Sequence, residues 1–471
     1  MSFTRTFLAW ALIAASTSLA VTACGDDGKA RDFGQADASD VDASGDASDI
    51  SDGGELGDGD ARAPFDPADE PVTCTKTPCA VELVAGDDHF CARMSDGTAR
   101  CWGSDHLGAL GRGADDDAGA GGAPDAGWSV SAVQGLADVV QLSAAGATTC
   151  ARVEAPGLAA RVVCWGGNEH GQLGLAADRA EADGDPHPEP TPPALPRDVA
   201  PAHVAVGPRG ACVVAASGAL VCWGDNEQQQ LARPGAEPVL APGAAETGAL
   251  TVARPVLATH TTLALTKGGE VWSWGAVGGP FGPVGGRIAS LSPDPLPGKV
   301  AGLANVSSLA VSSWVEDFES PEPGPPRAHA CAIAGGDVHC WGHTYRGALC
   351  TGVPDSERTP AHAPTHTAAW PQQVAVSDEL SCVRMTDGTV RCCGEDARGR
   401  LGTGKVRLLA SGFVQATAFT GHAVRVATSN GAVCALVQGG TVECWGSNAN
   451  GELGQPEPDE LDHPSPLPVR F

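Results

Sequence analysis

One pattern is written seven times along this chain, and it sets what the chain can fold into. Two cysteines flank a short turn, and Trp-Gly and a Gly-x-Leu-Gly-like stretch follow, as in Cys91 to Cys101-Trp102-Gly103. The Trp-Gly pair returns at intervals of 51 to 67 residues, with Cys393-Gly394 in its place in the sixth copy; the other positions are Trp165, Trp223, Trp274, Trp341 and Trp445. Repetition at this period indicates a repeat architecture.

Each copy predicts a β-hairpin with a disulfide across it. Cys91 and Cys101 are equidistant from Asp96, so they oppose each other around a Ser-Asp-Gly turn whose glycine takes the left-handed conformation. Opposed residues of antiparallel strands lie within disulfide reach. In the fourth copy both cysteines are absent together, replaced by Leu263 and Ser273, as a paired bridge predicts. The remaining predicted pairs are Cys150 with Cys164, Cys212 with Cys222, Cys331 with Cys340, Cys382 with Cys392, and Cys434 with Cys444.

Zinc is the alternative use of these cysteines, but zinc sites favour short Cys-x-x-Cys clusters, so no metal ligand is assigned. Four further cysteines are possible bridges. Cys350 stands where the fifth copy should have glycine, and Cys393 stands where the sixth should have tryptophan; a bond between them would compensate for the missing indole, with two free thiols as the alternative. Cys74 and Cys79 are expected to close a small loop where the repeats begin.

The amino terminus predicts export. Residues 1–23 have a basic Arg5, an apolar core too short to span a bilayer, and Val21-Thr22-Ala23 before Cys24. This stretch resembles the lipobox of bacterial lipoproteins, which implies lipidation of Cys24 and a membrane anchor. An ordinary signal peptide cleaved near Ala23 is the alternative. The prediction is a protein of the bacterial cell envelope, lipid-anchored to the outer or inner membrane.

Residues 24–72 are predicted to be a disordered acidic linker. From Gly25 to Val72 there are 15 acidic and three basic side chains and almost no large apolar residue, too little to offset the entropy of ordering. Calcium binding by Asp40, Asp42 and Asp46 is an alternative, but the ligands at positions five and twelve of a calcium loop are missing.

Residues 73–471 are predicted to form one domain. Copies such as Cys164-Trp165-Gly166-Gly167-Asn168 to Gly171-Gln172-Leu173-Gly174 resemble the regulator of chromosome condensation repeat over about residues 78–471. That resemblance implies an all-β fold, a seven-bladed β-propeller of four-stranded blades, with the Trp of each copy packed between blades. It also suggests that the carboxyl-terminal segment 466–471 completes the first blade and closes the ring.

Function is expected to be protein binding without catalysis. No nucleophile, phosphate-binding or metalloprotease motif occurs, and no cofactor is expected. An acidic exported chain, with a sequence pI near 4.6, does not suit nucleic acid. We expect a monomer whose partner is an envelope or extracellular protein.

Three inter-blade insertions are the candidate binding loops: residues 112–131, 175–197 and 313–328. The last carries an aromatic and acidic mixture suited to an interface, formed by Trp314, Glu316, Asp317, Phe318 and Glu319. The alternatives are a glycan-binding or glycan-degrading propeller, whose two carboxylates would face each other in a pocket, and a purely structural envelope protein.

Overall fold

A computed structural model describes residues 65–66, 68–113, 129–175, 182–278, 282–312, 328–344, 346–353 and 356–471. The chain divides into two units, Met1–Ala61 and Arg62–Phe471, and every described residue belongs to the second. In that part 28 strands form seven antiparallel sheets of four strands, each built from strands consecutive in sequence. The predicted all-β, seven-bladed propeller is therefore confirmed.

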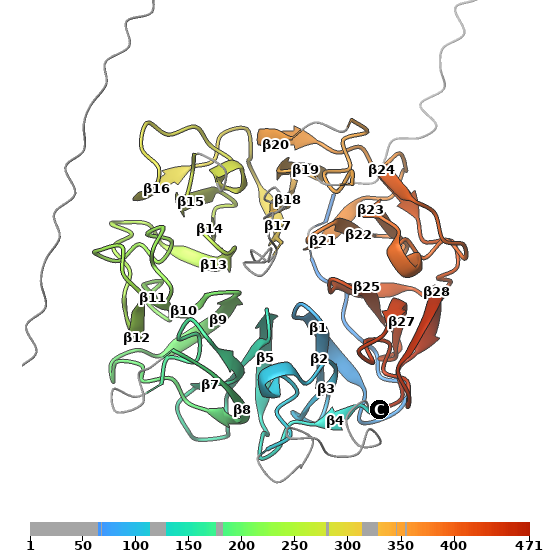
Figure 1. Cartoon of the computed structure of the whole chain (residues 1–471), viewed down its shortest axis with the longest axis horizontal. Helices are drawn as coiled ribbons and strands as arrows, with labels where there is room; N and C mark the ends of the chain where they lie inside the picture. Colours follow the sequence, from blue (N-terminus) through green and yellow to red (C-terminus); the bar gives the residue numbers. More distant parts are fainter. Residues whose placement is uncertain are drawn as a thin grey trace, which may run out of the picture. The chain divides into compact units, whose positions relative to one another are not determined.

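The blades follow one another around the ring, as Figure 1 shows. The first two contain β1 (Ala80–Ala85), β2 (His89–Met94), β3 (Ala99–Gly103) and β4 (Ser131–Ala132), then β5 (Val139–Ala145), β6 (Thr148–Val153), β7 (Arg161–Asn168) and β8 (Asp183–Thr191). The next two contain β9 (Pro201–Gly207), β10 (Gly210–Ala215), β11 (Leu220–Gly224) and β12 (Val239–Ala244), then β13 (Val252–Leu257), β14 (Thr261–Thr266), β15 (Val271–Gly275) and β16 (Asp294–Lys299).

The last three blades repeat the same order. They contain β17 (Val306–Val311), β18 (His329–Ala334), β19 (Asp337–Gly342) and β20 (Glu357–His362), then β21 (Pro371–Ser377), β22 (Leu380–Met385), β23 (Val390–Glu395) and β24 (Leu409–Gln415), then β25 (Ala423–Thr428), β26 (Ala432–Val437), β27 (Val442–Asn448) and β28 (Asp459–Pro468). Short 3-10 helices η1 (His106–Gly108), η3 (Gly282–Gly285) and η4 (Ala397–Gly399) lie between third and fourth strands. No helix in the described ranges is both long and apolar enough to cross a bilayer.

Alternating strand direction gives the ring two different faces. We call the face that carries the turns between second and third strands the hairpin face; an example is the turn Ser95-Asp96-Gly97. The opposite face, which carries the connections between first and second and between third and fourth strands, is the loop face. The first strand of every blade is innermost, and these seven strands line a central channel of about 480 Å³.

The hairpins have the predicted register. Cys91 faces Cys101, and Leu263 faces Ser273 in the blade without cysteines. Six cross-strand pairs are bonded, with Cα atoms 4.0 to 4.1 Å apart. The structure also joins Cys74 to Cys79 and Cys350 to Cys393. These eight bonds use 16 of the 17 cysteines, and the seventeenth is Cys24. The turn glycine has positive φ, +81° at Gly97 and +76° at Gly388, which explains glycine there.

In every blade except the sixth, a tryptophan packs against the preceding blade. The six indoles are fully buried, and each donates its N–H to a backbone carbonyl of the previous blade. The pairs are Trp102 with Glu452, Trp165 with Ala109, Trp223 with Gln172, Trp274 with Gln230, Trp341 with Val284, and Trp445 with Arg400, at 2.7 to 3.0 Å. The Trp of each repeat is thus a structural residue.

The prediction that residues 466–471 complete the first blade is wrong. Strand β28 pairs with β27 in the seventh blade, where Cys444 faces Leu467. After β27 ends at Asn448, the chain is long enough to turn back and run antiparallel to β27 as β28. The fourth strand of the seventh blade therefore comes from the same repeat as its third strand. The ring instead closes through packing: the ring of Phe471 lies 5.7 Å from that of Trp102 in the first blade, edge to face.

Candidate functional site

The predicted lipidation site and binding-loop residues lie outside the described part of the chain. They are Cys24, Trp314, Glu316, Asp317, Phe318 and Glu319. The two ends of the connection that holds the last five are described. Ser312 is buried after β17, and its Oγ accepts a hydrogen bond of 3.0 Å from the backbone N–H of His329 at the start of β18. The connection therefore starts and ends beside the innermost strand of the fifth blade, at the loop face.

This connection differs from its counterparts in the other blades. First and second strands are joined there by two or three residues, for example Gly146-Ala147 in the second blade, whereas residues 312–328 join β17 to β18. The other two predicted insertions join β3 to β4 and β7 to β8. All three were expected between blades. This expectation is wrong for the first and third insertions, and for the second as far as Thr191; residues 192–197 of the second do lie between blades, after β8 and before β9. Residues 183–191 of the second insertion are strand β8 itself.

Because all three connections join first to second or third to fourth strands, their ends share the loop face. The same face holds a cleft of about 210 Å³ between the first and second blades, which we call the loop-face cleft. Its ionisable lining residues are carboxylic acids and histidines, with no lysine or arginine among them: Asp87, Asp88, Glu169, His89, His106 and His170. Sequence reasoning missed this cleft because the connections that form it are short and ordinary in composition.

Burial shifts several pKa values around this cleft. It raises the pKa of Asp88, an effect that His106 partly offsets, and it raises the pKa of neighbouring Glu452. It lowers the pKa of His170, and nearby Arg209 lowers it further. In the described ranges no group of three or more His, Cys, Asp or Glu side chains is placed to hold a metal ion. The cleft is therefore a partly desolvated acidic surface.

Two histidines that precede hairpin cysteines bridge neighbouring blades. His89 Nε2 lies 2.8 Å from Thr149 Oγ1, and His329 Nε2 lies 2.8 Å from Ser381 Oγ. Complete burial lowers the pKa of His89 to about 4. Each histidine has a structural role here, because it is buried and joins its blade to the next through a side-chain contact at hydrogen-bond distance.

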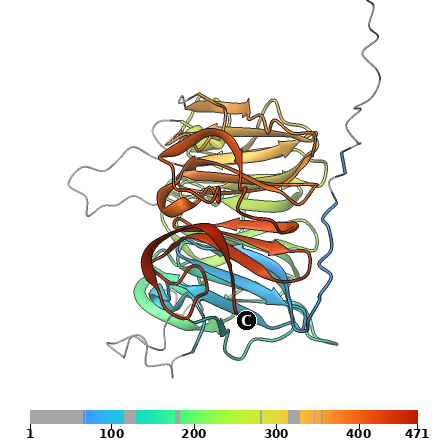
Figure 2. The ribbon, with the colours of Figure 1, turned by 90° about the vertical axis from the view of Figure 1, so that its right-hand side faces the viewer.

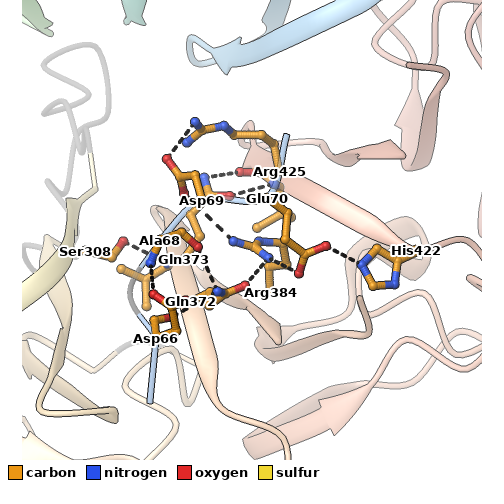
Figure 3. A network of polar contacts seen from close by, with 12 residues as sticks. Asp66, Ala68, Asp69, Glu70, Ser308, Gln372, Gln373, Arg384, His422 and Arg425 are labelled. Atoms are coloured by element: carbon orange, nitrogen blue, oxygen red, sulfur yellow. Dashed lines mark hydrogen bonds and ion pairs between the residues drawn. The ribbon is translucent and has the colours of Figure 1, made fainter. Parts of the chain in front are cut away.

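Residues 65–66 and 68–75 lie across the hairpin face before β1 begins, although the sequence predicts a disordered linker up to residue 72. Figure 3 shows this segment against the fifth, sixth and seventh blades. Asp69 pairs with Arg425 at 2.9 Å, and Glu70 lies 2.7 Å from His422. The backbone N–H groups of Thr73 and Thr75 then bond to the hairpin of the seventh blade, at Gln438 and Gly439. Figure 2 shows the segment running along one face of the ring. We call residues 65–66 and 68–75 the strap.

Comparison with known proteins agrees with this architecture. The family model for the regulator of chromosome condensation (RCC1) repeat matches residues 80–109. The structure of human WBSCR16 is similar, with a TM-score of 0.64 and 19% sequence identity over 82% of this chain and 95% of that chain. Yeast RCC1 (Prp20), solved bound to Kap60, is similar with a TM-score of 0.61 and 16% identity over 86% of this chain and 88% of that chain. Thus residues 80–109 match the RCC1 repeat model, and the described part of the chain has a seven-bladed β-propeller fold similar to that of these two structures.

Proposed function

We propose that this protein is an exported, monomeric, non-catalytic propeller that binds another protein at its loop face, and that Cys24 anchors it by a lipid in the cell envelope. The observation that carries the proposal is the connection 312–328. Six blades join their first two strands by two or three residues, and only the fifth has a long connection there among strands that are all described. Rigid scaffolds present binding residues on such connections.

The residue types support a protein as the partner. The connection contains Trp314 and Phe318 among carboxylates, a mixture of aromatic anchors and charge that suits an interface. The loop-face cleft adds acidic side chains on the same face. A partner with lysine or arginine on its surface would pair with these carboxylates, which would raise the association rate as well as the affinity.

Export is supported by the cysteine chemistry. Disulfides persist in oxidising compartments and are rare in the cytosol, and eight pairs are bonded here. The remaining cysteine follows a lipobox-like stretch. Mass spectrometry of the protein isolated from membranes would test the anchor: we expect a diacylglyceryl group on Cys24, and an unmodified mature chain that begins elsewhere would contradict it.

Affinity capture tests protein binding. The bait is the full chain with Cys24→Ser, exposed to envelope and culture-medium proteins. We expect one protein to be retained in a fixed ratio and to be lost when residues 315–326 are deleted. The matched control deletes residues 156–159 in the hairpin-face turn of the second blade, which gives Cys150 and Cys164 the ten-residue separation of Cys91 and Cys101. Equal retention by both deletion variants would overturn the assignment.

A glycan-binding or glycan-degrading function would most readily use the loop-face cleft. Asp88, whose pKa burial raises, and Glu169 line the same cleft, and a carboxyl group with a raised pKa can act as a general acid. A protein that binds or cleaves polysaccharides, with loss of this property in Asp88→Asn and retention in the 315–326 deletion, would replace the protein-binding proposal.

A further inference from the structure

The surface under the strap has three features of a peptide-binding site. Its first anchor is aromatic: the rings of Phe65 and Trp370 are 5.7 Å apart at an interplanar angle of 57°. The floor beside them is Gly336, in the two-residue turn of the fifth blade. A Cβ at Gly336 would lie 2.7 Å from the Trp370 ring and 3.3 Å from the Phe65 ring. Glycine is therefore needed to leave room for this aromatic pair.

The second feature is recognition of backbone. The side-chain amide of Gln372 donates hydrogen bonds to the carbonyl oxygens of Asp66, at 3.1 Å, and Ala68, at 3.0 Å. Gln372 is itself held by Arg384, whose guanidinium donates to its amide oxygen. These bonds hold an extended segment whatever its side chains are, as backbone bonds do in many peptide complexes.

The third feature is a pair of guanidinium groups, with a histidine beside them, that faces two adjacent carboxylates. Arg384 has no exposed side-chain surface and lies 3.9 Å from Asp69 and 3.6 Å from Glu70. Arg425 pairs with Asp69, and His422 lies beside Glu70, as Figure 3 shows. Burial lowers the pKa of Arg384, and the two carboxylates oppose that shift. A buried guanidinium that lost both carboxylates would be strongly disfavoured.

The blades complete their sheets without this segment. The fifth, sixth and seventh sheets each have four strands of their own, and residues 65–70 belong to none of them. The contacts come from side chains that project from completed blades, together with one side-chain amide that binds backbone. The segment thus contacts complete blades in the manner of a bound peptide.

We propose that this surface is a recognition site for a peptide with one aromatic residue followed, four and five positions later, by two carboxylates, and that residues 65–70 occupy it in cis. We name it the strap groove, formed by Gly336, Trp370, Gln372, Arg384, His422 and Arg425. A partner peptide of the same chemistry gains access by displacing the strap. Short tethers give effective concentrations in the millimolar range, so the strap excludes weak ligands and admits strong or multivalent ones.

A binding experiment with the full chain tests this proposal. The probe is a fluorescein-labelled peptide with the sequence of residues 62–72, and its anisotropy is followed as protein is added. The strap variant Phe65→Ala, Asp69→Asn, Glu70→Gln frees the groove, and we expect it to bind the probe at least tenfold more tightly than the unaltered chain. Adding Arg425→Gln to the strap variant should weaken binding at least fivefold, while Arg358→Gln, an exposed arginine on β20, should leave it unchanged.

Two results would overturn the proposal. Equal affinity of the probe for the unaltered chain and the strap variant would place its binding elsewhere, and no binding to either would show that the groove does not accept this peptide in trans. The single variant Asp69→Asn, measured in the same way, guards against a folding defect in the triple variant. The test is independent of the loop face, since the 315–326 deletion should leave the probe affinity unchanged.

Discussion

The bond between Cys350 and Cys393 takes the place of a glycine and the indole that packs against it. In the sixth-to-seventh junction, a Cβ at Gly402 would lie 2.8 Å from Trp445 Nε1, and at Gly111 it would lie 2.9 Å from Trp165 Nε1. An indole in the sixth blade would therefore collide with a side chain at position 350. Because position 393 is cysteine, the space admits Cys350, and the two sulfur atoms bond.

The first prediction concerns this exchange. Loss of the bridge should cost about 4 kcal/mol for a loop of this length. Cys393→Trp alone should destabilise the fold by more than this, because the new indole would also collide with the Cβ of Cys350. The double variant Cys350→Gly, Cys393→Trp restores the pattern of the other blades and should recover at least half of that loss. Urea unfolding of both single variants and the double variant measures the coupling; additive effects would refute the exchange.

The second prediction concerns the glycine that faces an indole. Gly174 has positive φ, and a Cβ there would lie 2.6 Å from Trp223 Nε1. Gly174→Ala should cost more than about 2 kcal/mol, because the backbone strain of a left-handed residue adds to overpacking. Gly157→Ala is the matched control, since Gly157 has positive φ and nothing within 4 Å of an added Cβ. It should cost about 1 kcal/mol, and equal thermal shifts would contradict this account.

The third prediction concerns the indole hydrogen bond. Trp165→Phe removes the donor to the Ala109 carbonyl and leaves that buried oxygen without its partner. The expected loss is about 1 to 3 kcal/mol in the free energy of unfolding, beyond the smaller loss of apolar area. Trp272→Phe is a suitable control because the Trp272 side chain is only partly buried and its N–H meets Glu270 at 3.3 Å. An equal or larger loss at Trp272 would contradict this role of the buried bond.

The fourth prediction concerns pH. His89 has a pKa of about 4 in the folded state, below the value of about 6.5 expected when unfolded. As the pH falls, the imidazole of His89 is protonated in the unfolded chain before it is protonated in the folded one. The free energy of unfolding therefore decreases as the pH falls from about 6.5 to 4. His89→Thr should reduce the loss between pH 7.5 and pH 4.5 by on the order of 2 kcal/mol.

Urea midpoints of the two proteins at both pH values give the comparison. His203 and His260 also have pKa values lowered to about 4 by burial, so part of the pH dependence should persist in the variant. An unchanged pH dependence would mean that His89 does not titrate as its burial requires.

The sequence determined the repeating features of this protein because they are local. The hairpin register, the turn glycines and the cross-strand pairing of cysteines all depend on residues less than 15 positions apart, and the number of blades is the number of copies of that local pattern. Alternation of side chains along a strand and the need for positive φ in a tight turn fix such features without reference to the rest of the chain. The pairing of Cys350 with Cys393 could also be predicted from the sequence, because the two cysteines replace the usual glycine and tryptophan in successive copies of the repeat.

Only the tertiary structure decided the strap and the last strand. Asp69 and Glu70 belong to a stretch whose composition matches a solvated linker, and their partners lie more than 300 residues away on the sixth and seventh blades. Packing of the sixth blade against the seventh brings Arg384, His422 and Arg425 together. The interaction energy of the Asp69 and Glu70 carboxylates depends on that arrangement. Likewise, the residue pattern of β28 suits a strand of the first blade as well as one of the seventh. The structure places it in the seventh, where the chain turns back and β28 pairs antiparallel with β27.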